Sequence, residues 1–138
     1  MSDATTPASK VEAFLDNIRL YNDDREAWEA ALPEDAVLET DSAWPDGGRF
    51  EGKAEILAFL RKFEEAWSEI RYDVEQVEQV GDAVVARSRW VVRGSSSAVP
   101  TEVGFSAVAS VDERGEVRAS RFFFDHDRAL GFARTRAR

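Results

Sequence analysis

The sequence predicts an α+β fold, in which three N-terminal helices pack in the concave face of a strongly bent, mostly antiparallel sheet of about five to six strands. Two observations lead to this prediction. Apolar residues recur at helical spacing in the first half of the chain, whereas the second half contains long segments of alternating apolar and other residues. Helices followed by a run of strands are typical of α+β proteins.

Three consecutive strands are predicted at Ala83–Arg93, Thr101–Val111 and Glu116–Phe124. The middle one has apolar residues at every second position, which gives one buried face. Asp112–Gly115 is a hairpin signal between the second and third strands. Since a three-stranded meander with one apolar face is not stable alone, the first half of the chain must cover it.

The helices are predicted from start signals and apolar stripes. Ser9 can cap a first helix, with Glu12 three residues later as in a capping box. Asp24 can cap a short second helix over residues 25–32, which Pro33 ends. A third helix follows Gly52 with a strong apolar stripe.

Shorter segments complete the predicted domain. Strands are expected at 36–41, 49–51 and 70–80, and residues 125–133 end the fold as a short helix or an ordered tail. We expect a flexible N-terminus over 1–9, one domain over 10–132 and a basic tail over 133–138.

Composition excludes several function classes. The 138 residues carry a net charge of −9, which disfavours a nucleic-acid partner. There is no cysteine and only one histidine, so we expect no disulfide and no metal site built from these residues. No apolar run is long enough to span a membrane, and the N-terminus does not resemble a secretory signal. A cytoplasmic protein is therefore predicted.

Large aromatic side chains predict an internal pocket for an apolar small molecule, because rings seldom fill a small concave space completely. The alternative is that the rings simply form the core. The predicted pocket residues are Phe14, Ile18, Tyr21, Trp28, Trp44, Phe59, Phe63, Trp67, Trp90, Phe105, Ala107, Phe122 and Phe124.

Several short motifs, taken in order, resemble the SnoaL-like branch of the nuclear transport factor 2-like superfamily over roughly residues 10–132. This resemblance implies a cone-like roll with a pocket between sheet and helices, and often a homodimer. It also implies either cofactor-independent isomerase, cyclase or hydrolase chemistry, or binding alone. The motifs are Tyr21-Asn-Asp-Asp24, Asp35-Ala-Val37, Gly47-Gly-Arg-Phe-Glu-Gly52, Phe63-Glu-Glu-Ala-Trp67, Gly81-Asp82, Val92-Arg-Gly-Ser95 and Phe123-Phe-Asp125.

The resemblance transfers few catalytic residues. The general base of ketosteroid isomerases falls at Thr40 or Asp41, and their two oxyanion donors fall near Asn17 and Ala107. SnoaL-type cyclases use an Asp and a His, and the single histidine here is His126. Asp41 and His126 are therefore the candidate catalytic residues, with Tyr21 as a polar helper.

Epoxide hydrolases of this superfamily use an Asp-Arg-Asp relay. Arg87 or Arg89 with Asp41 would supply only part of such a relay. If the strand Ala83–Arg93 is aligned without a gap to the ketosteroid isomerases, these arginines are expected to face inward. The cost of burying unpaired charge favours the opposite facing, with Trp90 inside.

Two further expectations follow. Apolar rings around an inward-facing Asp41 would raise its pKa and make it a base. The small, apolar outward side chains of the meander, such as Ser106, Val108 and Phe123, predict a homodimer through the outer face of the sheet. An enzyme and a non-catalytic binding module both remain open.

Overall fold

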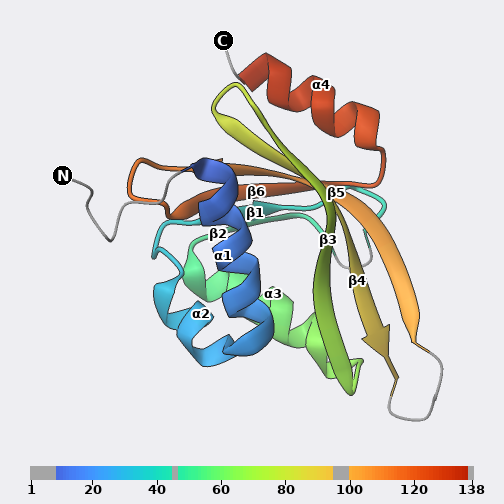
Figure 1. Cartoon of the computed structure of the whole chain (residues 1–138). Helices are drawn as coiled ribbons and strands as arrows, with labels where there is room; N and C mark the ends of the chain where they lie inside the picture. The colour runs from blue at the N-terminus through green and yellow to red at the C-terminus, as the bar shows by residue number, and fades with distance from the viewer. Residues whose placement is uncertain (1–8, 45–46, 95–99, 137–138) are drawn as a thin grey trace.

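A computed structural model describes residues 9–44, 47–94 and 100–136, and it confirms the predicted α+β class. In these ranges four helices accompany one six-stranded, mostly antiparallel sheet that does not close (Figure 1). None of the described helices is long and apolar enough to cross a membrane. The elements are α1 (Lys10–Asp23), α2 (Arg25–Ala31), β1 (Val37–Glu39), β2 (Arg49–Glu51), α3 (Lys53–Glu65), β3 (Glu69–Val80), β4 (Ala83–Arg93), β5 (Thr101–Val111), β6 (Val117–Phe123) and α4 (His126–Arg136).

The sheet runs in the order β2-β1-β6-β5-β4-β3. Every neighbouring pair is antiparallel except β1 and β6, which run parallel with Leu38 opposite Ser120. The register of β3 against β4 shifts between Val74 and Gln76, and such a bulge increases local twist. The sheet bends around α1, α2 and α3, which lie on its concave side (Figure 1).

Side-chain caps fix the first two helices. The Ser9 hydroxyl accepts a hydrogen bond from the Glu12 amide at 3.1 Å, as predicted. The Asp24 carboxylate accepts from the Ala27 amide at 3.1 Å, so α2 begins directly where α1 ends. Asn22 then joins α1 to the edge strand β3, donating to the Tyr72 carbonyl at 2.8 Å and accepting from the Tyr72 amide at 3.0 Å.

The facing of β4 agrees with the charge argument. Val84, Ala86 and Trp90 belong to the core on the concave side. Arg89 lies on the outer side, where its guanidinium contacts Glu102 at 3.3 Å and Asp73 at 3.6 Å. Arg87 is exposed, so neither arginine reaches the interior to form a catalytic relay.

The outer side of the sheet carries α4, which corrects the predicted tail. Ala129 and Ala133 of α4 are fully buried in a second core cluster with Val85, Val108 and Phe123. The rings of Phe123 and Phe132 lie 5.5 Å apart. Residues 133–136 therefore belong to a packed helix, because alanines allow close approach to the sheet. The remaining tail residues 137–138, and residues 1–8 of the predicted flexible N-terminus, lie outside the described ranges.

This packing also explains the small outward side chains that predicted a dimer face. Val108 and Phe123 pack against α4, and the Ser106 hydroxyl lies 2.7 Å from Nδ1 of His126 in α4. The homodimer stays a prediction, and its proposed face is occupied in part by the chain's own helix.

Candidate functional site

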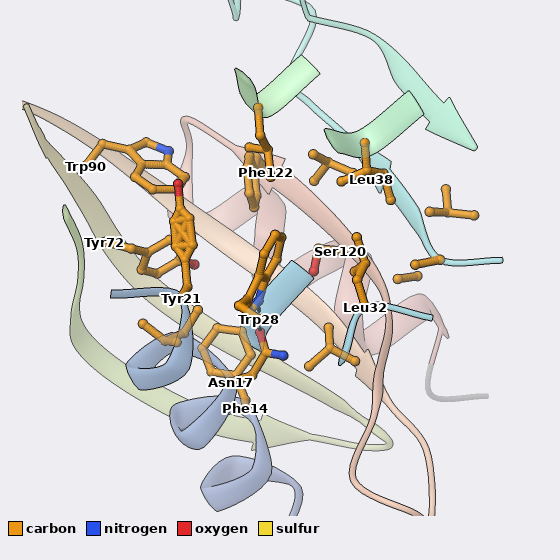
Figure 2. Close-up of a pocket in the computed structure, with 17 residues that line it drawn as sticks. Phe14, Asn17, Tyr21, Trp28, Leu32, Leu38, Tyr72, Trp90, Ser120 and Phe122 are labelled. Carbon is orange, nitrogen blue, oxygen red and sulfur yellow. Dashed lines mark hydrogen bonds between the residues drawn. The ribbon is translucent and has the colours of Figure 1, made fainter. Parts of the chain in front are cut away.

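A cavity of about 80 Å³ lies between the helices and the concave face of the sheet. Figure 2 shows Tyr21, Tyr72 and Trp90 on one side of it, and Leu32, Leu38 and Ser120 on the other. The wall consists of Phe14, Asn17, Ile18, Tyr21, Trp28, Leu32, Ala36, Val37, Leu38, Ile56, Leu60, Tyr72, Trp90, Val117, Ala119, Ser120 and Phe122.

The local sequence explains why these side chains meet. Phe14, Asn17, Ile18 and Tyr21 are three or four residues apart along α1, so they share one face of that helix. Ser120 and Phe122 alternate along β6 and reach the cavity from the opposite wall. Most of the wall is aliphatic or aromatic, which makes the cavity suitable for an apolar molecule.

Two neutral polar side chains, Asn17 and Ser120, belong to the cavity wall. Nε1 of Trp28 donates a hydrogen bond to Oδ1 of Asn17 at 3.2 Å, which fixes the amide and leaves its Nδ2 donor for another partner. On the opposite wall, the Ser120 hydroxyl has no hydrogen bond to any residue that the structure describes. Both groups are therefore available to a ligand that carries a carbonyl or hydroxyl.

Tyr21 connects the cavity wall to an ion pair. Its hydroxyl donates to Glu64 at 2.7 Å, Glu64 also pairs with Arg25, and the Arg25 guanidinium lies 3.5 Å from the centre of the Tyr21 ring. Burial raises the pKa of Tyr21 above its ordinary value, and the Glu64 carboxylate adds to the rise. The phenol is therefore neutral and acts as a hydrogen-bond donor.

Tyr72 is the second phenol of the wall. Its hydroxyl lies 3.3 Å from the Ser88 hydroxyl inside the core. Burial raises the pKa of Tyr72 above its ordinary value, although the hydrogen bond with Ser88 opposes the shift. Both tyrosines of the wall thus stay uncharged at neutral pH.

Thirteen residues were predicted to line the pocket, and the structure divides them into two groups. The wall includes Phe14, Ile18, Tyr21, Trp28, Trp90 and Phe122. The other seven lie outside it, because their side chains fill the adjoining core or lie at its rim: Trp44, Phe59, Phe63, Trp67, Phe105, Ala107 and Phe124.

Several wall residues were not predicted from the sequence. Ser120 has the same parity along β6 as Phe122, so strand alternation contained the signal for it. Tyr72 likewise alternates with Val74 in β3. Leu32 and Ala36 join the wall from the segment between α2 and β1, where no periodic pattern indicates facing, and Val37 joins it from the start of the short strand β1.

Asp41 does not face the cavity, and the prediction of a raised pKa is wrong. Its Oδ1 accepts a hydrogen bond from the Ala43 amide at 3.0 Å, and its Oδ2 accepts from the Phe124 amide at 3.2 Å. These two bonds, helped by Arg128 and Arg121, lower the pKa of Asp41 below its ordinary value of 3.8. The inward position one residue earlier belongs to Thr40, which is buried.

We expect Asp41→Asn to lower the free energy of unfolding by about 1 kcal/mol at neutral pH, because an amide keeps only one acceptor oxygen. A lowered pKa in the folded state stabilises the fold above the unfolded-state pKa and loses that effect as the pH falls through the folded-state value. The difference between the variant and the native chain should therefore shrink below about pH 4. Urea unfolding across pH 3–7 measures it, with the exposed Asp82→Asn as control; a difference independent of pH would contradict this account.

His126 also lies away from the cavity. It is the first residue of α4 on the outer side of the sheet, where its Nδ1 bonds Ser106. The candidate catalytic residue His126 therefore does not line the cavity. Among the residues that the structure describes, no group of three or more His, Asp or Glu is arranged to hold a metal ion.

The fold resembles several solved structures at low sequence identity. A putative SnoaL-like polyketide cyclase from Shewanella denitrificans is 15% identical, with a TM-score of 0.66 over 96% of this chain and all of the other. An LEH-like epoxide hydrolase from M. tuberculosis is 18% identical, with a TM-score of 0.61 over 93% of this chain and 90% of the other. A hypothetical protein of ketosteroid isomerase-like fold from Catenulispora acidiphila, in complex with trimethylamine, is 12% identical, with a TM-score of 0.66 over 88% of each chain. No functionally curated protein matches the sequence.

An open sheet bent around three helices, with an apolar cavity between them, defines a class of small-molecule pocket proteins. The SnoaL-like domain family matches residues 11–124. The chain belongs to that family, as the sequence motifs predicted, and its fold resembles that of a solved NTF2-like protein.

Proposed function

We propose that this protein binds a small, neutral, mostly apolar molecule in the cavity and does not transform it by acid–base chemistry. The observation that carries the proposal is the composition of the wall. Its seventeen residues include no Asp, Glu, His, Lys or Arg. General acid–base catalysis needs a group within hydrogen-bond reach of the reacting atom that can gain or lose a proton near neutral pH. Neither Asp41 nor His126 lines the cavity, and burial raises the pKa of the Tyr21 and Tyr72 phenols so that they stay protonated.

The wall also supports a particular ligand chemistry. A charged ligand would lose its hydration without gaining an opposite charge, which is costly. A carbonyl or hydroxyl could accept from Asn17 or bond Ser120 while the rest of the molecule contacts rings and aliphatic side chains. Phenol and cyclohexanone combine these features in one small ring.

We expect phenol to bind with an affinity on the order of millimolar, as its few heavy atoms permit. Benzoate and benzylammonium, of similar size but charged, should bind at least about tenfold more weakly. Ser120→Ala should weaken phenol binding about threefold by removing one hydrogen bond, whereas the exposed Ser42→Ala should not change it. Calorimetric titration measures these affinities; equal binding of neutral and charged rings would contradict the proposal.

The second candidate function is a cofactor-free enzyme, and the contact between Tyr21 and Glu64 favours it. Tyr21 is the wall residue whose hydroxyl bonds a carboxylate in the described structure, so the pair could exchange a proton with a bound ketone. Deuterium exchange at the α-carbons of cyclohexanone distinguishes the candidates. The binding proposal predicts no acceleration over buffer by the native chain, while acceleration that Tyr21→Phe abolishes and Asp41→Asn preserves would establish the enzyme instead.

A further inference from the structure

Trp44 lies on the turn that follows β1, yet its indole is buried in the core with only 5% of its surface exposed. It contacts four phenylalanine rings that come from α3, β5 and the end of β6. The distances between ring centres are 6.3 Å to Phe63, 5.6 Å to Phe105, 5.5 Å to Phe122 and 5.3 Å to Phe124. A loop residue thus fills space that no helix or strand fills in this part of the fold.

The space that Trp44 fills adjoins the cavity. Phe122 lines the cavity on one side and contacts Trp44 on the other. Trp90, also in the wall, lies 5.8 Å from Phe105 and 5.6 Å from Phe63, both of which contact Trp44. The indole therefore lies one ring behind the cavity wall, between the cavity and the outer ring of Phe124.

The turn that presents Trp44 is held by its own backbone. The Trp44 amide donates to the Asp41 carbonyl at 2.9 Å, and the Gly47 amide donates to the Trp44 carbonyl at 3.0 Å. A Cβ atom at Gly47 would lie 2.1 Å from Oγ1 of Thr40, so the turn requires glycine there. None of these contacts involves the indole, so the turn does not depend on it.

The indole itself contributes volume and ring contacts. Its Nε1 is buried without a hydrogen-bond partner in the described structure, which costs free energy. The cavity that remains, about 80 Å³, is smaller than the roughly 150 Å³ cavity known to take up benzene. A one-ring molecule is therefore the upper limit for a ligand beside an intact Trp44.

We propose that Trp44 determines ligand size: its indole supports Phe122, the ring that closes this end of the cavity, and so restricts the site to compact molecules of one ring. Truncation of the indole lets the Phe122 ring move into the vacated space, which lengthens the cavity enough for two fused rings. This inference rests on the proposed binding function and names the ligand class of the same site.

The test compares phenol with naphthol as calorimetric probes of the native chain, Trp44→Ala and Trp44→Leu. Naphthol affinity should rise at least about tenfold in Trp44→Ala, because the second ring gains buried apolar contacts, while phenol affinity changes less than about threefold. Trp44→Leu should give a smaller gain in the same direction, and it retains a side chain in the core should the alanine variant not fold. Trp67→Ala removes an equal side chain that lies outside the wall and should leave both affinities unchanged.

The binding function and the size limit set by Trp44 are tested by different measurements. Phenol binding to the native chain tests the binding function alone, and its absence would contradict that function. The change in naphthol affinity between the native chain and the Trp44 variants tests the size limit alone. An unchanged ratio of naphthol to phenol affinity in both variants would overturn the role of Trp44 even where phenol binds.

Discussion

Replacement of Trp90 by alanine is expected to lower the free energy of unfolding by about 3–5 kcal/mol, the largest loss among single truncations of the core. Trp90 is 3% exposed, and its ring centre lies 4.8 Å from Tyr72, 5.6 Å from Tyr21 and 5.8 Å from Phe105. Removal of the indole breaks contacts to helix and sheet at once and enlarges a cavity that is already present. Urea unfolding followed by circular dichroism measures the loss.

Trp90→Phe is the matched control. Nε1 of Trp90 is buried without a hydrogen-bond partner in the described structure, so phenylalanine keeps a ring and removes a donor that is not satisfied. We expect this variant to lose less than about 1.5 kcal/mol. A loss below about 1 kcal/mol in Trp90→Ala would show that the ring is not part of a packed core.

Ala133→Asp is expected to lower the free energy of unfolding by about 3 kcal/mol or more, because it places a carboxylate in an apolar contact. Ala133 is fully buried between α4 and the outer side of the sheet, beside Val85, Val108 and Phe123. The variant should also bind an apolar fluorescent dye, since a displaced α4 exposes Val108 and Phe123. Urea unfolding and dye fluorescence measure the two effects.

Thr135→Asp gives the control for this variant on the same helix. Thr135 is exposed and near the same end of α4, so both aspartates meet the helix dipole in a similar way. The control should change stability by no more than about 0.5 kcal/mol. Equal stability of the two variants would show that α4 does not pack on the sheet.

The arrangement of β4 could be predicted from sequence because burial of charge is costly. Arg87 and Arg89 have the same parity along the strand, so Trp90 had to face the interior, and it does. The helix caps at Ser9 and Asp24 were predictable for a different reason: each is a local contact between residues three positions apart.

The position of Asp41 could not be predicted, because it depends on a contact between distant parts of the chain. Strand β1 ends at Glu39, Thr40 turns inward to bond Gly48, and Asp41 accepts a hydrogen bond from the Phe124 amide. A shift of one residue decides which of Thr40 and Asp41 is buried. Only the completed sheet determines that register.

The helix α4 was underestimated because its contact face is made of small residues. Ala129 and Ala133 give a weak apolar signal, while the arginines among them resemble a solvated tail. Conversely, too many residues were predicted to line the pocket, because every large ring is a candidate for its wall. Packing alone decides that Trp44 fills the core while Trp28 lines the cavity.

The parallel pairing of β1 with β6 has a consequence for how the chain folds as it is synthesised. Leu38 of β1 can pair with Ser120 of β6 only after β6 has been synthesised, when most of the chain has left the ribosome. Until then α1, α2 and α3 can cover only the β3–β5 part of the sheet, and the β1–β2 hairpin, with three residues in each strand, cannot persist alone. Such non-local pairing slows folding and exposes apolar helix faces in the nascent state. We therefore expect the N-terminal half to be more prone to aggregation in chains that have not yet formed the last strand.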